Sequence, residues 1–451
     1  MQAVAIVAGV VGTAPCAVLI DYTGTNGAQG LDVFKDVIYA TDFGDDRGLS
    51  WLVSGQNKNV QVGGPLAAHV YDLPGVYTIK VRATDSAGNF SDTTVQITVL
   101  DPNVVYAGAK TVAVSLAGVF TGAPTGAAQL RALPTQWNGL RVLLHAGEAT
   151  SYGDISIQDG NSGVMVGTYG SGSKPIVGGV GVGNWRPASA AFASNIVVQG
   201  LSVKNGMQQS IGGKVMFIGN DVQVAAGSNG IPMGIGEEDY WYRGDQYRAV
   251  PQSAFYNARE IFLVENNCIG ANTTDSIGGF WGSGSRVAML GNRFGKAQMH
   301  SARFSALDRG FLGHNEFQGI SADGIRHSLK LHSNGLNPYA DGSINDTSGQ
   351  GGWASGRNVI ANNLFGNALD NNDWTVAVSP QNDQYAEGIE KTIVENNRFV
   401  QGTKTSTDLI LAGRNLIWRG NSRVGASGAI RESQAHDGAL PADWKGPYIQ
   451  Q

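Results

Sequence analysis

The densest run of ionisable side chains lies between residues 300 and 332, and it could carry out acid–base chemistry. Leu329 and Leu331 can face a core while Lys330 and His332 face outward together, because successive residues of a strand point to opposite sides. Clustered cations lower one another's pKa. A lysine there could remove the proton next to a uronate carboxylate, while an arginine neutralises that carboxylate and a histidine or arginine protonates the leaving oxygen.

This combination indicates β-elimination on an acidic glycan. Lys330 is the predicted base, and Arg303 or Arg326 is the predicted clamp for the substrate carboxylate. The candidate catalytic residues of the run are Lys330, Arg303, Arg326, His332 and His314, and the candidate substrate-binding residues are His300 and His327. The same side chains would also fit a solvated polar face of a repeat protein, without any catalytic role.

A second candidate site is the acidic turn Asp370-Asn371-Asn372-Asp373, which Trp374 follows. Two carboxylates beside an aromatic ring could act as acid and base in glycoside hydrolysis, with Asp370 and Asp373 as the catalytic pair. Asx-rich turns also occur for purely structural reasons. Acidic loops could instead bind Ca²⁺ through oxygen ligands, although no EF-hand spacing is present. The sequence therefore identifies no certain cofactor and leaves Ca²⁺ open.

Three long insertions interrupt the regular pattern and could wall a groove for a glycan. They span Gly234–Arg259, Ser333–Arg357 and Pro380–Glu390, and they combine aromatic rings with charged side chains. Rings stack on sugar faces, whereas charged groups bind hydroxyl or acidic groups. The alternative is a flap that only shields the solenoid. The candidate substrate-binding residues of these insertions and of the acidic turn are Glu237, Asp239, Trp241, Tyr242, Arg243, Trp353 and Trp374.

A repeat that runs through the C-terminal two-thirds of the chain would position these residues. Each repeat has apolar residues, then small or polar ones, an Asn, a free position and usually a Phe. The asparagines are Asn220, Asn267, Asn292, Asn315, Asn363, Asn397 and Asn421. The period is about 24 residues if each of the two longest steps between them spans two repeats and one other step contains an insertion.

That period predicts an all-β fold, a right-handed parallel β-helix over residues 103–451. Each repeat is too short to bury its own apolar face, so it must stack on its neighbours. We expect each Asn to tolerate a left-handed turn and to form an amide ladder with the next one. The Phe two positions further on is expected to point into the core and to stack likewise.

Residues 1–102 are predicted to form a separate β-sandwich. Alternating apolar and polar residues at 77–82 and 95–99 are typical of half-buried antiparallel strands. The motifs Gly12-Thr13-Ala14-Pro15, Asp42-Phe43-Gly44-Asp45 and Pro74-Gly75-Val76-Tyr77 resemble the PKD family, an immunoglobulin-like module of extracellular carbohydrate-active and surface proteins. Thr41 stands where that family usually has Trp. The resemblance implies a spacer or binding module, joined to the solenoid by a short linker at 101–103.

The solenoid itself carries further resemblances. The segment Tyr169-Gly170-Ser171-Gly172-Ser173-Lys174-Pro175 resembles the connection between early coils of pectate-lyase-like β-helix proteins, which act mainly on acidic or complex polysaccharides and include phage tailspikes. The arrangement of Arg303, Asn315-Glu316-Phe317 and Lys330 is similar to the alginate lyase and chondroitinase B family. There a Lys and an Arg on successive coils carry out β-elimination. In this chain the order of Arg and Lys is reversed and their spacing is longer.

Composition limits the partners and the location. Gly accounts for 64 of 451 residues and the net charge is −5, which favours turn-rich β structure and provides no basic surface for nucleic acid. No apolar run is long enough to predict a membrane span. Cys16 and Cys268 are expected to be buried thiols rather than a disulfide. The apolar segment at 3–11 is interpreted as the first strands rather than as a signal peptide.

Together these observations predict an extracellular or virion-associated enzyme that degrades a polysaccharide. A lyase is the first choice, and a tailspike-type hydrolase using Asp370 and Asp373 is the alternative. The rival from another class is a non-catalytic glycan-binding phage tail or adhesin protein. The expected partner is a polysaccharide, without nucleic acid or membrane insertion, and a phage origin would imply a homotrimer.

Overall fold

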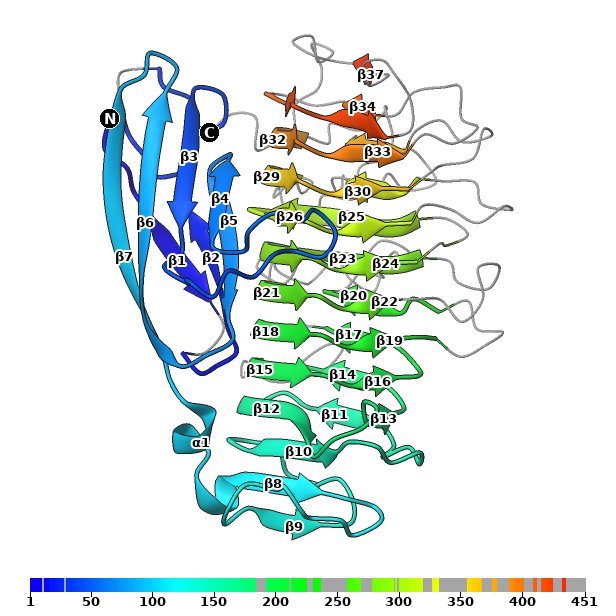
Figure 1. Ribbon diagram of the computed structural model, residues 1–451. Helices are drawn as coiled ribbons and strands as arrows, with labels where there is room; N and C mark the ends of the chain where they lie inside the picture. The colour runs from blue at the N-terminus through cyan, green and yellow to red at the C-terminus, as the bar shows by residue number, and fades with distance from the viewer. Residues whose placement is uncertain are drawn as a thin grey trace, which may run out of the picture.

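The computed structural model describes most of the chain. The described residues are 1–9, 12–27, 30–183, 192–210, 212–224, 230–236, 258–268, 278–295, 297, 300–318, 327–331, 355–366, 375–378, 389–400, 409–411, 415–424 and 432–434. In these ranges two antiparallel sheets at the N-terminus are followed by long parallel sheets (Figure 1). Within them, none of the helices has the length and apolar character needed to cross a membrane.

The N-terminal region is a sandwich of two antiparallel sheets that share one core. The first sheet contains β1 (Ile6–Gly9), β2 (Cys16–Asp21) and β5 (Leu66–Tyr71). The second contains β4 (Val60–Gly63), β3 (Val37–Asp42), β6 (Gly75–Asp85) and β7 (Phe90–Val99). Val18 and Ile20 of the first sheet pack with Tyr39 and Val81 of the second. The immunoglobulin-like topology and the PKD resemblance stay predictions.

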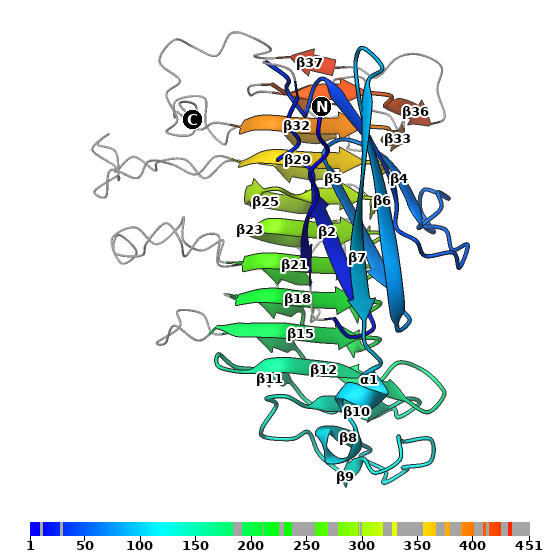
Figure 2. The ribbon, with the colours of Figure 1, turned by 90° about the vertical axis from the view of Figure 1, so that its left-hand side faces the viewer.

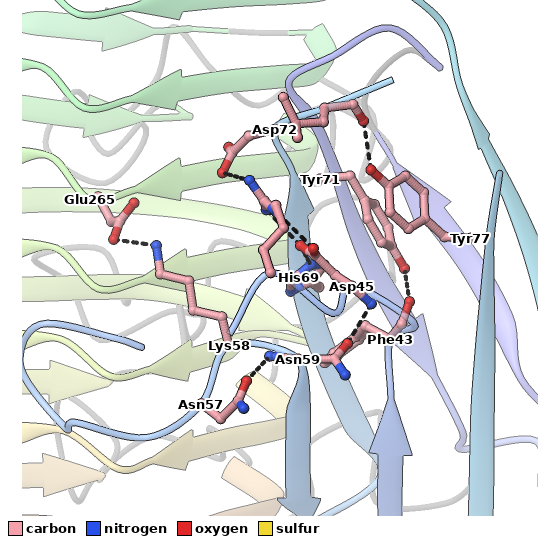
Figure 3. Close-up of polar contacts among 12 residues, drawn as sticks. Phe43, Asp45, Asn57, Lys58, Asn59, His69, Tyr71, Asp72, Tyr77 and Glu265 are labelled. Atoms are coloured by element: carbon pink, nitrogen blue, oxygen red, sulfur yellow. Dashed lines mark hydrogen bonds and ion pairs between the residues drawn. The ribbon is translucent and has the colours of Figure 1, made fainter. Parts of the chain in front are cut away.

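Asp42 ends β3, and Phe43-Gly44-Asp45 follows it and serves the sandwich itself; Figure 3 shows the contacts of Phe43 and Asp45. Gly44 has a φ of +71°, and a Cβ there would lie 2.7 Å from a backbone carbonyl oxygen, so this turn requires glycine. The Asp45 carboxylate accepts a hydrogen bond from Arg47 Nε at 2.7 Å and lies 3.0 Å from His69 Nε2. Although burial opposes the charge, these two partners hold the pKa of Asp45 well below its usual value.

The chain from residue 111 winds into a right-handed parallel β-helix, which confirms the predicted fold class. A helical turn, α1 (Pro102–Val105), and a short 3-10 helix (Gly108–Lys110) connect it to the sandwich. Most coils contribute three strands, one to each face of the solenoid, and each strand pairs in parallel with its equivalent on the next coil.

The first face lies against the N-terminal sandwich. Its strands are β9 (Ala128–Leu130), β8 (Thr111–Val114), β10 (Arg141–His145), β12 (Ser162–Tyr169), β15 (Ala193–Gln199), β18 (Gly212–Ile218), β21 (Ala258–Val264), the second half of β23 (Gly278–Leu290), β26 (Phe311–Gly313), β29 (Ser355–Ala361), β32 (Ile389–Glu395) and β35 (Ile417–Arg419).

The second face contains strands of two or three residues. They are β13 (Ile176–Val177), β16 (Ser202–Val203), β19 (Asp221–Val222), β22 (Asn267–Cys268), β24 (Arg293–Phe294), β27 (Glu316–Phe317), β30 (Leu364–Phe365), β33 (Arg398–Val400) and β36 (Ser422–Val424).

The third face completes each coil. Its strands are β11 (Ile155–Ile157), β14 (Val180–Val182), β17 (Met207–Gln209), β20 (Met233–Ile235), the first half of β23, β25 (His300–Asp308), β28 (Leu329–Leu331), β31 (Val376–Val378), β34 (Leu409–Leu411) and β37 (Glu432–Gln434).

The predicted phenylalanine stack is confirmed on the second face. Phe294, Phe317, Phe365 and Phe399 point into the core on successive coils, with ring centroids 5.4, 5.1 and 5.2 Å apart. Each ring is at most 1% exposed. Identical rings at the same level of each coil thus fill the interior continuously, as stacked repeats require.

The asparagine ladder is present, but one of its predicted members is wrong. It contains Asn220, Asn266, Asn292, Asn315, Asn363, Asn397 and Asn421, so Asn266 takes the place that we assigned to Asn267. Each amide Nδ2 donates to the Oδ1 of the next Asn at 3.0 Å. Asn267 instead begins β22 and is partly exposed.

The left-handed turn residue is not the ladder asparagine but the residue before it. Those residues are Gly219, Glu265, Gly291, His314, Asn362, Asn396 and Gly420, with φ between 49° and 65°. The expected tolerance of Asn for left-handed geometry therefore applies to Asn362 and Asn396. The ladder asparagines instead stabilise the corners through the hydrogen bonds of their side chains. The role of the ladder is to satisfy buried backbone groups at each corner.

The longest repeat steps are single coils and not pairs of coils. Val215 of β18 pairs directly with Ile261 of β21, and Phe311 of β26 pairs directly with Val359 of β29. Each long step therefore contains one insertion, and the assumption of doubled steps was wrong. A period read from sequence cannot separate two short coils from one coil with a long loop.

The sandwich packs along the outer side of the first face of the solenoid (Figures 1 and 2). A continuous apolar cluster joins the two parts. It includes Leu19, Phe34, Leu66 and Val70 of the sandwich and Met216, Phe262, Leu290, Phe311 and Ile393 of the solenoid. Buried Glu395 also accepts a hydrogen bond from the Gly64 amide at 2.8 Å and one from Arg419 Nε at 2.8 Å. The sandwich is thus docked against the solenoid rather than projecting from it.

The loop between β3 and β4 reaches from the sandwich onto the corner that precedes the asparagine ladder (Figure 1). Lys58 Nζ lies 2.6 Å from Glu265 Oε1 (Figure 3), and Gln56 Nε2 donates to Asn362 Oδ1 at 2.9 Å. The loop therefore binds several coils at once, at their left-handed turn residues.

Candidate functional site

The strands of the third face bring Arg303 and Lys330 together. Parallel pairing of β25 with β28 places Arg303 in register with Lys330 on the next coil. Leu329 and Leu331 are fully buried in the core, so the lysine between them points outward, as predicted. Lys330 is 8% exposed and Arg303 is 5% exposed. Two cations from successive coils therefore lie side by side in a sheltered position.

Trp281 of β23 extends this row by one coil, and sequence reasoning missed it. It pairs in register with Arg303, whose Cζ lies 5.0 Å from the centroid of the indole ring. A Cβ at Gly278 would lie 2.3 Å from Trp281 Nε1, so the ring occupies space that glycine leaves free. The signal available in the sequence was the spacing, since Trp281 precedes Arg303 by about one coil.

Two histidines lie three positions before the cations on the same two coils. His300 begins β25. His327 occupies the equivalent position before β28, because the number of residues from His300 to His327 equals the number from Arg303 to Lys330, which pair in register. Their ring centroids are 5.5 Å apart, and the side chains are buried. The third face thus combines two cations, two imidazoles and an aromatic ring on adjacent coils.

This group of residues, which we call the cationic row, contains Trp281, His300, Arg303, His327 and Lys330. It can bind an anion through the guanidinium and the ammonium, and it can exchange a proton through the imidazoles. The indole ring offers a flat apolar surface next to the charges. Of the predicted site residues, His300, Arg303, His327 and Lys330 are therefore brought together.

His314 lies elsewhere, so its assignment as a catalytic residue is corrected. It occupies a left-handed corner of the solenoid, where its ring stacks on Trp51 with centroids 5.1 Å apart. Its Nδ1 atom lies 2.8 Å from Ser54 Oγ. Both contacts come from the loop of the docked sandwich, and they bury the ring. Its role is therefore to hold the two parts of the chain together.

This buried histidine predicts a loss of stability in acid. Burial, with a contribution from Lys58, lowers the pKa of His314 from its usual value to about 3. Between pH 6.5 and about 3 the unfolded chain binds a proton that the folded chain does not, so stability falls as pH falls, by up to about 1.4 kcal/mol per pH unit. Denaturant unfolding at pH 7, 6, 5 and 4 should show this slope.

The matched variant is His314→Asn, because Asn362 and Asn396 occupy equivalent left-handed corners. It should be less stable than the wild type at pH 7, having lost the ring on Trp51, yet its stability should fall less steeply in acid. Equal slopes for the two proteins would contradict the assignment of the titrating group to His314.

The remaining candidate residues lie outside the described residues. They are Arg326, His332, Asp370, Asp373, Glu237, Asp239, Trp241, Tyr242, Arg243, Trp353 and Trp374. Their roles stay predictions, as does the use of Ca²⁺. Among the residues that the structure describes, no group of three or more His, Cys, Asp or Glu side chains could hold a metal ion.

The fold and the site define the chain as a right-handed parallel β-helix protein with a docked N-terminal sandwich. No known protein-family model matches the sequence, and no curated protein matches it either. Similar solved structures include the A-module of a mannuronan C-5 epimerase of Azotobacter vinelandii, with 9% identity, a TM-score of 0.37, and coverage of 66% of this chain and 86% of that one.

Two further solved structures are similar. One is a surface protein and adhesin of Streptococcus pneumoniae, with 10% identity, a TM-score of 0.31, and coverage of 66% of this chain and 87% of that one. The other is a family 28 exopolygalacturonase of Yersinia enterocolitica, with 10% identity, a TM-score of 0.29, and coverage of 96% and 98%. Likenesses this distant do not assign an activity to this chain.

Proposed function

We propose that this protein is a polysaccharide lyase that cleaves an acidic glycan by β-elimination at the cationic row. The observation that carries the proposal is the in-register pair of Arg303 and Lys330, outward-facing on adjacent coils. A solvated polar face would leave such side chains exposed, whereas both are buried here together with His300 and His327. Shelter from water strengthens their interaction with a bound anion.

In the proposed reaction, Arg303 binds the carboxylate of a uronate residue and stabilises the negative charge that develops there. Lys330, in its neutral form, takes the proton from the carbon next to the carboxylate. The electron pair of that C–H bond forms a C=C bond, and the glycosidic C–O bond breaks. His300 or His327 gives a proton to the leaving oxygen. Trp281 would support the sugar ring beside Arg303.

The test is to incubate the full chain with alginate, pectate and glycosaminoglycans, with and without Ca²⁺, and to follow the ultraviolet absorbance of the new C=C bond. We expect the absorbance to rise on at least one acidic glycan and not on a neutral one. If new reducing ends form without that absorbance, the reaction is hydrolysis and the lyase proposal fails. Saturable binding without product would identify a glycan-binding protein instead.

We also propose that the protein acts outside the cell or as part of a virion, where polymeric acidic glycans are met. The docked sandwich is a fixed part of the molecule rather than a flexible tether, because its apolar contact with the solenoid is continuous over many coils. The homotrimer that a phage origin would imply can be tested by measuring the mass of the protein in solution.

A further inference from the structure

Arg141 of β10 is a buried cation without a carboxylate partner among the described residues. Its side chain is 5% exposed, and burial lowers its pKa. Asp101, whose charge acts on it in the opposite direction, is engaged in capping α1. Because an uncompensated buried charge destabilises a fold, such an arginine calls for a partner from outside the chain or for a dense set of hydrogen bonds.

Among the residues that the structure describes, two supply hydrogen-bond acceptors to Arg141. Its Nε donates to Thr111 Oγ1 at 2.9 Å, and its Nη1 donates to Asn103 Oδ1 at 3.0 Å. A guanidinium carries five N–H donors in one plane. The two bonds fix the orientation of the plane, and they leave the outer part of the fork available to an anion.

Arg141 lines two hollows at the junction of the sandwich, the linker and the first coils. Their volumes are about 340 and 320 Å³. The larger one is also lined by Asn103, Thr168, Tyr169 and Gln199. Gly167 of β12 lies between Leu143 and Gln199, two residues that line this hollow, and a Cβ at this glycine would approach Gln199 Nε2 to 3.0 Å.

We propose that the larger hollow binds one acidic sugar residue, with its carboxylate on the guanidinium of Arg141. The planar fork matches a carboxylate through two parallel hydrogen bonds. The hollow is larger than an inorganic ion needs and reaches the lower end of the range of small-molecule sites. The amides of Asn103 and Gln199 and the hydroxyl of Thr168 suit sugar hydroxyls. This site is on the first face, on earlier coils than the cationic row, and does not depend on the proposed lyase activity.

The test is calorimetric titration of glucuronate into the full chain carrying Arg303→Gln, so that binding at the cationic row is weakened. We expect saturable binding that becomes about tenfold weaker or more in Arg141→Met, which keeps the apolar stem and removes the donors. Gln199→Glu should weaken glucuronate binding by a similar factor, although it shortens no side chain. Its carboxylate, fixed in the hollow, would pair with Arg141 and compete with the sugar. Arg131→Met, at an exposed arginine of the same region, is the control and should bind as the parent does.

Glucose and inorganic phosphate complete the experiment. Displacement of glucuronate by galacturonate but not by glucose supports recognition of an acidic sugar. The proposal is overturned if glucose binds equally well, if only phosphate binds, if no saturable binding occurs, or if a folded Arg141→Met protein binds unchanged. Should Arg141→Met not fold, unchanged binding by Gln199→Glu overturns it alone. Turnover by Lys330 is measured separately, so either proposal can fail without the other.

Discussion

Replacement of Lys330 by arginine is expected to lower kcat on the acidic glycan by about 10²- to 10⁴-fold, the usual contribution of a general base. Arginine also places a long, nitrogen-bearing side chain on the third face, but it stays protonated at neutral pH and cannot accept the substrate proton. The flanking Leu329 and Leu331 anchor the strand in the core, so the backbone should stay in place. Initial rates of C=C formation measure the effect.

Arg303→Gln should have a different kinetic signature. Because the clamp holds the carboxylate both in the ground state and in the transition state, its loss should raise KM as well as lower kcat. Lys204→Arg is the matched control, since Lys204 follows β16 on the second face and pairs with Gln223 there. Its rates should equal those of the wild type.

A Lys330→Arg enzyme that keeps its kcat within a factor of about two would exclude Lys330 as the base.

Asn266→Ala is expected to destabilise the protein by about 3–5 kcal/mol. The Asn266 side chain accepts hydrogen bonds from the backbone N and the Nδ2 of Asn220 at 3.1 and 3.0 Å. It donates to the Phe217 carbonyl at 2.7 Å and to Asn292 Oδ1 at 3.0 Å. Asn220 and Asn292 are fully buried, so the groups left without a partner cannot turn to water.

Asn267→Ala is the control for this prediction, because it removes the same side chain one residue later. Asn267 is partly exposed and lies outside the ladder, so the change in unfolding free energy should stay within about 0.5 kcal/mol. Both variants are compared by urea unfolding followed by tryptophan fluorescence. Equal shifts for the two variants, or a larger shift for Asn267→Ala, would contradict the ladder as a source of stability.

The difference between Asn266 and Asn267 shows how far a repeat pattern can be followed in a sequence. The segment Glu265-Asn266-Asn267-Cys268 offers two asparagines, and both fit an Asn-based pattern within one position. The structure selects Asn266 because Glu265 adopts the left-handed turn, with a φ of 49°. Backbone conformation at a corner depends on the stacked coils, so local sequence alone does not fix it.

The sequence contains a pattern that indicates the docked sandwich, although none of the motifs described above includes it. Strands of the first face, such as Val215–Ile218 and Ile261–Val264, are continuously apolar rather than alternating. Continuous apolar strands indicate burial on both sides of a sheet. Met216 and Phe262 indeed point outward and are buried by the sandwich, while their neighbours point into the solenoid. The partner surface itself could not be inferred from these strands.

By itself the sequence determined that this chain contains a parallel β-helix, because periodic Asn and Phe residues demand identical positions on stacked coils. It also placed Lys330 on the outside, because two leucines flank it in a strand. Tertiary structure decided which residues meet. Equivalent residues on adjacent coils are 19 positions apart at Ile196 and Val215 but 48 apart at Phe311 and Val359. Since loops of any length can separate paired strands, only the hydrogen-bonded register joins Trp281, Arg303 and Lys330. His314 is separated from them by its position at a corner of its coil, where the sandwich covers its ring.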